Sequence, residues 1–133
     1  NSRSQSTLSL TISHEKFYEK IKISDPRLKF LGDDSLHHEV LNSLKESKCL
    51  IYGSSLESFG MPLIEANLLN IPVIAFEKSF VYEFSNPIYT YRSKEELTKL
   101  LDNLDINSLI MKEPHRKRVN STSDFLAYIE TLL

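Results

Sequence analysis

The sequence has very little of what marks secreted, membrane-spanning or nucleic-acid-binding proteins. Cys49 is its single cysteine, so an internal disulfide is excluded and a reducing, cytoplasmic compartment is expected. Apolar runs stay well short of the roughly 20 residues that a membrane-spanning helix needs. Basic residues do not outnumber acidic ones, and a net charge of −2 argues against a nucleic-acid partner.

The beginning of the chain has neither an initiator methionine nor the apolar segment of a signal peptide. The composition is 41% hydrophobic and 26% charged, which is ordinary for a globular protein. At 133 residues the chain fits one domain. We therefore expect a single domain over residues 1–133 that is a fragment of a longer protein.

Apolar runs alternate with amphipathic segments, which predicts strands and helices in alternation and hence an α/β fold with a parallel sheet. Strands are expected at residues 8–12, 28–31, 49–52, 72–76 and 88–91. Helices are expected at residues 14–23, 36–46, 61–69, 94–103 and 122–133. The helix after residue 93 has a capping box, in which Ser93 is followed three residues later by Glu96.

The chain has only three glycines, and each follows a predicted strand. Gly32 and Gly53 are explained as well by tight turns as by a ligand. Gly60 is different because its loop also carries Glu57 and leads, through Met61 and Pro62, into a helix that contains Glu65. Two carboxylates at the carboxyl end of a strand, beside a helix N-terminus, suit a ligand with hydroxyls and phosphates, such as a nucleotide-sugar.

The segment SSLESFGMPLIEANLLNIPVIA resembles the donor-binding, C-terminal half of the group 1 glycosyltransferases, which are retaining enzymes of the GT-B fold. The shared features are a glutamate, seven residues and a second glutamate, followed by Pro-Val-Ile-Ala. Residues 28–32, 36–47 and 80–89 extend the resemblance over approximately residues 8–103. It implies a Rossmann-like parallel sheet flanked by helices, without the family's first strand–helix unit. It also implies a role in the synthesis of lipopolysaccharide or another cell-surface polysaccharide.

The resemblance assigns roles to particular residues. Glu57 would act at the anomeric carbon of the donor sugar, and Glu65 would accept hydrogen bonds from the ribose diol. The alternatives are a solvated loop acid for Glu57 and a first-turn glutamate, favoured by the helix dipole, for Glu65. The donor-binding residues are expected to be Gly32, Asp33, Ser58, Phe59, Gly60, Met61, Pro62 and Glu65.

The resemblance also implies the partners. The donor is a nucleoside-diphosphate sugar, and no metal or other cofactor is expected. The acceptor, a glycan or a lipid-linked glycan, would bind through an N-terminal half that precedes this chain. Peripheral association of the parent protein with the inner face of the membrane is left open.

Two departures from the family pattern leave a second function open. Ser58 stands where the family usually has glycine, and residues 13–16 do not match the arginine and lysine that grip the diphosphate. A degenerate, non-catalytic module that binds nucleotides or other proteins would tolerate both departures. Sequence upstream of this chain that contained the arginine and lysine would favour the enzyme.

Other candidate sites are weaker. His37, His38 and Glu39 with Asp33 and Asp34 have the composition of a metal site, but adjacent helical histidines point about 100° apart. The basic run at residues 115–118 is too short to bind anionic lipid strongly. A phosphoacceptor receiver domain is rejected, because the strand at 49–52 ends without an aspartate.

Overall fold

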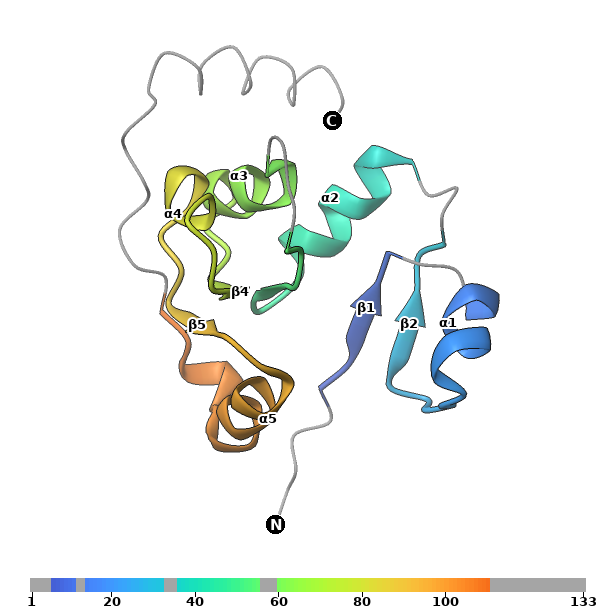
Figure 1. Cartoon of the computed structure of the whole chain (residues 1–133). Helices are drawn as coiled ribbons and strands as arrows, with labels where there is room; N and C mark the ends of the chain where they lie inside the picture. The colour runs from blue at the N-terminus through green and yellow to red at the C-terminus, as the bar shows by residue number, and fades with distance from the viewer. Residues whose placement is uncertain (1–5, 12–13, 33–35, 56–59, 111–133) are drawn as a thin grey trace. The chain divides into compact units, whose positions relative to one another are not determined.

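The computed structural model describes residues 6–11, 14–32, 36–55 and 60–110 (Figure 1). The chain divides into two compact units, Asn1–Ser43 and Leu44–Leu133, and each is considered by itself. The helix expected at residues 122–133 and the basic run at 115–118 lie outside the described residues.

The first unit contains a parallel strand pair with a helical crossover. Strands β1 (Leu8–Leu10) and β2 (Leu28–Phe30) pair in parallel, with Leu8 opposite Leu28, and α1 (His14–Ile21) connects them. The rings of Phe17 and Phe30 lie 5.3 Å apart, so α1 packs against β2. A turn lies between α1 and β2, where the Asp25 carbonyl accepts a hydrogen bond from the Leu28 N–H at 3.0 Å.

Helix α2 (His37–Lys45) follows β2 and ends inside the second unit. Its first turn is closed by Glu39, whose Oε2 accepts a hydrogen bond from the Leu36 N–H at 3.0 Å. Such a bond satisfies one of the donors that a helix N-terminus leaves open. The helix predicted at residues 36–46 is thereby confirmed to within one residue at each end.

The second unit is a three-stranded parallel sheet in which β4 is the middle strand. Its strands are β3 (Leu50–Tyr52), β4 (Val73–Phe76) and β5 (Tyr89–Tyr91). Helix α3 (Met61–Leu68) connects β3 to β4, and the short α4 (Val81–Phe84) lies between β4 and β5 in sequence. After β5 come α5 (Lys94–Asn103) and a 3-10 turn (Ile106–Ser108). Helix α4 was not predicted from the sequence.

The predicted fold class is confirmed, because the strands pair in parallel and alternate with helices. Among the described residues, β1 and β2 form a two-stranded sheet in the first unit, and β3, β4 and β5 form a three-stranded sheet in the second. In the parts of the chain that the structure describes, no helix is long and apolar enough to cross a membrane.

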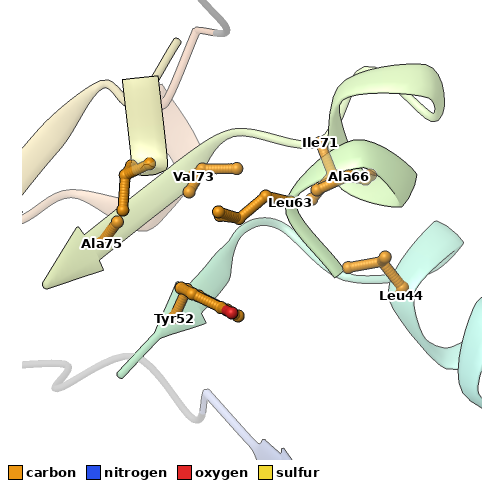
Figure 2. Close-up of a cluster of buried hydrophobic side chains, with 8 residues drawn as sticks. Leu44, Tyr52, Leu63, Ala66, Ile71, Val73 and Ala75 are labelled. Carbon is orange, nitrogen blue, oxygen red and sulfur yellow. The ribbon is translucent and has the colours of Figure 1, made fainter. Parts of the chain in front are cut away.

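The core of the second unit lies between its sheet and α3. Figure 2 shows Leu63 of α3 pointing toward Val73 of β4, with Tyr52 of β3 beside them. Ile74 is also fully buried but does not belong to this cluster. Because side chains alternate along a strand, β4 is covered on both faces. The buried cluster comprises Leu44, Tyr52, Leu63, Ala66, Ile71, Val73, Ala75 and Val81.

Candidate functional site

The candidate site of the second unit begins at the N-terminus of α3. Gly60 is the N-cap and adopts a left-handed conformation, with φ 60° and ψ 36°. Its carbonyl accepts hydrogen bonds from the N–H groups of Leu63 and Ile64, at 3.0 and 3.1 Å. Pro62 lies in the first turn, as predicted, where its missing N–H costs nothing. The N–H groups of Gly60 and Met61 precede the first intrahelical bonds and lie at the positive end of the helix dipole.

A glycine is required at position 60 by the surrounding side chains as well as by the positive φ angle. A Cβ atom at this position would lie 2.6 Å from Cδ2 of Phe84, inside contact distance. The space left by the absent side chain is therefore occupied by an aromatic ring of the same chain. A ligand at Gly60 would therefore have to approach from the N–H side.

Glu65 lies in the second turn of α3 and is buried, with 3% of its surface exposed. Its helix neighbours Leu63 and Ala66 are both completely buried in the apolar core. The first turn of α3 contains no acidic residue, so the alternative that Glu65 is a first-turn glutamate does not hold. A carboxylate in this position is stable only with polar partners.

The other end of the β3–α3 connection is held by Tyr91. The Tyr91 hydroxyl donates a hydrogen bond to the carbonyl of Tyr52, the last residue of β3, at 3.3 Å. A Cβ atom on Gly53 would lie 3.3 Å from the same hydroxyl, which explains a glycine there without a ligand. Burial raises the pKa of the Tyr91 hydroxyl, so it stays protonated and continues to donate.

The remaining predicted site residues are divided between the first unit and undescribed positions. Gly32 follows β2 and has a φ of +86°, with open space where its Cβ would be. A glycine is therefore required at position 32 by the backbone conformation alone. Asp33, Glu57, Ser58 and Phe59 lie outside the described residues.

A polar cluster that sequence reasoning missed lies where β4 and β5 end. The Tyr82 hydroxyl donates to both carboxylate oxygens of Glu77, at 2.8 and 3.0 Å. The Thr90 hydroxyl also donates to Glu77, and these hydrogen bonds, followed by the nearby positive charge of Arg92, lower the pKa of the Glu77 carboxyl. Nothing in the local sequence pattern indicated this cluster, because it joins residues of three separate segments.

The described residues contain no group of three or more histidine, cysteine, aspartate or glutamate side chains placed to hold a metal ion. Cys49 precedes β3 and is partly buried, and this burial raises the pKa of its thiol. A thiol that stays protonated is a poor nucleophile.

Comparison with known proteins gives one match. A family model described as group 1 glycosyl transferases matches residues 15–90, which contain β2 to β4, α3 and the candidate site of the second unit. Searches of curated proteins and of solved structures gave no match.

Proposed function

Since this chain belongs to the group 1 glycosyl transferases, we propose that it forms the donor-binding, C-terminal half of a retaining enzyme of the GT-B fold. The enzyme would move a sugar from a nucleoside-diphosphate sugar to a glycan or lipid-linked acceptor, in the synthesis of a cell-surface polysaccharide. The observation that carries the proposal is the buried carboxylate of Glu65, one turn beyond the helix start at Gly60 and inside the matched segment.

Glu65 is proposed to bind the ribose of the donor. A ribose presents two adjacent hydroxyl groups, and one carboxylate can accept a hydrogen bond from each. Hydrogen bonds to an ionised carboxylate are stronger than those between neutral groups. A ligand that brings two hydroxyls therefore matches this residue better than an apolar ligand would.

The phosphates of the donor are proposed to lie at the N-terminus of α3. The N–H groups of Gly60 and Met61 and the helix dipole favour negative charge at this position. The helix supplies only about half a positive charge, whereas a nucleoside diphosphate carries about two negative charges. The chain has a net charge of −2 and no match to the family's arginine and lysine at residues 13–16. We therefore propose weak binding and no sugar transfer by this chain alone.

Glu57, which lies outside the described residues, is proposed to act on the donor sugar. The family resemblance puts it near the anomeric carbon, where positive charge develops as the bond to the leaving group breaks. A residue that meets charge present only in the transition state raises turnover more than affinity. In the complete enzyme, Glu57→Ala is expected to lower kcat strongly while the affinity for the donor changes little. Equal losses of kcat and donor affinity would contradict this role.

A second candidate function is a non-catalytic nucleotide-binding or interaction module of the same fold. Ser58, in place of the family's glycine, is the observation that favours it. Ser58→Gly in the complete protein separates the two functions. An enzyme that tolerates serine should keep its activity or gain some, whereas a degenerate module should remain without transfer activity.

A titration with UDP, GDP and ADP, followed through the backbone amide NMR signals, tests the proposed function. We expect one of the three to shift the signals of Gly60, Met61 and other α3 residues in a saturable way. The binding should weaken as salt is added, because exposed charges are screened. Absence of saturable shifts with all three nucleotides, or shifts confined to residues far from α3, would overturn the proposal.

A further inference from the structure

Phe84 contacts the helix start that carries the proposed donor site, although it belongs to a later segment of the chain. Its Cδ2, Cγ and Cε2 atoms lie 2.6, 3.2 and 3.3 Å from the position that a Cβ on Gly60 would take. The ring thus covers the Cα of Gly60 directly. Gly60 itself is buried, and α3 has no side-chain cap that would hold its first turn.

The conformation of Gly60 decides where the first N–H groups of α3 point. Its carbonyl is already engaged by Leu63 and Ile64. The left-handed φ angle then fixes the direction of its own N–H relative to the helix. Because glycine reaches several backbone regions at little cost, something outside the helix must restrict it. The ring of Phe84, which lies against the Cα of Gly60, is placed to do so.

Phe84 is itself held firmly. Val81, in the same short helix, is completely buried in the core of the second unit. Ser85 follows Phe84 directly and closes α4, since both its N–H and its hydroxyl donate to the Val81 carbonyl, at 2.9 and 3.1 Å. Beyond this closure, the Ile88 N–H donates to the Val73 carbonyl at 2.9 Å, which fixes the segment to β4. The ring is therefore a rigid support.

We propose that Phe84 is a positioning residue, which acts through Gly60 to orient the N–H groups that receive the phosphates of the donor. This inference rests on the proposed function and deepens it. It assigns to α4, which was not predicted as a helix, a part in donor binding without contact to the donor. A side chain that only fills the core would affect stability and leave affinity unchanged.

The test compares Phe84→Ala with a matched variant, Phe80→Ala. Phe80 packs against the same core cluster and forms an edge-to-face pair with Tyr52, with ring centroids 6.4 Å apart, so both variants remove a phenylalanine from one segment. The readouts are the amide signals of Gly60 and Met61 in the free protein, and the affinity for UDP, GDP or ADP, whichever the unmodified chain binds best.

Phe84→Ala should move the Gly60 and Met61 signals and weaken the affinity roughly tenfold to a hundredfold, as expected when binding groups are misplaced by about 1 Å. Phe84→Tyr keeps the ring and should restore both readouts, and Phe80→Ala should change neither. In Phe84→Ala, a second substitution, Gly60→Ala, should cost less affinity than in the unmodified chain, because the ring no longer clashes with the added methyl group.

The outcomes separate this inference from the function on which it rests. If the unmodified chain and Phe84→Ala bind the nucleotide with the same affinity, the role of Phe84 is overturned and the proposed function still stands. An equal loss of affinity in Phe80→Ala would also overturn it, because the effect would then be one of general packing. Failure of the unmodified chain to bind any of the three nucleotides would overturn the proposed function together with this inference.

Discussion

The hydroxyl of Tyr91 donates a hydrogen bond to the carbonyl oxygen of Tyr52 over 3.3 Å and so links β5 to β3 across the middle strand of the sheet. Tyr91→Phe removes this donor and leaves a buried carbonyl without it. We expect the free energy of unfolding to fall by about 1 kcal/mol, measured by urea denaturation. Tyr89→Phe is the control, because Tyr89 lies on the same strand but is 45% exposed. Equal losses in the two variants would contradict the assigned hydrogen bond.

Gly60 and Gly32 should respond differently to substitution by alanine. Both have positive φ angles, so each variant should lose about 1–2 kcal/mol through backbone strain. Gly60→Ala also drives a methyl group into Phe84, which should add about 1–3 kcal/mol. Amide hydrogen exchange measures the loss separately in the unit that carries each glycine. A Gly32→Ala loss as large as that of Gly60→Ala would show that the contact with Phe84 is not costly.

Asp25 should titrate well below the ordinary range of an aspartate. Arg27 donates to it through its backbone N–H, Nε and Nη2, at 2.9, 3.0 and 2.7 Å. These hydrogen bonds lower the pKa of Asp25 from 3.8 to about 2, and those from the Arg27 side chain contribute more than the one from its backbone. An NMR pH titration of the carboxyl signal should show this value, and Arg27→Gln should raise the pKa toward 3.8, while Lys29→Gln should leave it unchanged.

The sign of the pH dependence follows from this direction. Because the pKa is lower in the folded chain, the pair stabilises the fold above pH 3.8, and this contribution is lost as the pH falls toward 2. The pair is exposed, so the effect on stability should be small. A pKa of Asp25 near 3.8 in the unmodified chain would show that the ion pair does not form in solution.

Local signals in the sequence predicted most of the helices and strands. The capping box at Ser93 forms as expected, since the Ser93 hydroxyl oxygen accepts from the Glu96 N–H at 3.1 Å. The carboxylate of Glu96 accepts from the N–H of Arg92 at 2.6 Å, one residue before the N-cap. Such signals are readable because they join residues three or four positions apart. The short helix at Val81–Phe84 has no side-chain cap and was missed.

The candidate site was only partly predictable for the same physical reason. The spacing of the glutamates and the helix start at Gly60 could be recognised in the sequence, and the donor-binding role of Glu65 stays a prediction. The contacts of Gly60 with Phe84 and of Tyr52 with Tyr91 could not be recognised in the sequence, because each joins distant segments through tertiary packing. The burial of Glu65 also depends on the whole core. Only the structure shows that the ring of Phe84 requires a glycine at position 60, and that the hydroxyl of Tyr91 lies close to Gly53.

The central claim is that Glu65 holds the donor nucleotide, and its most direct test is the affinity of Glu65 variants for UDP, GDP or ADP, whichever binds best. Two hydrogen bonds to a charged group contribute on the order of 3 kcal/mol, so Glu65→Ala should bind roughly a hundredfold more weakly. Glu65→Gln preserves the shape of the side chain and checks that the loss does not come from misfolding. Glu83→Gln serves as the control, because it removes a charge from an exposed glutamate of α4.

If Glu65 holds the donor nucleotide, both Glu65 variants should lose affinity while they keep the amide spectrum of a folded chain, and Glu83→Gln should bind as the unmodified chain does. Unchanged nucleotide affinity in folded Glu65→Ala and Glu65→Gln would contradict it.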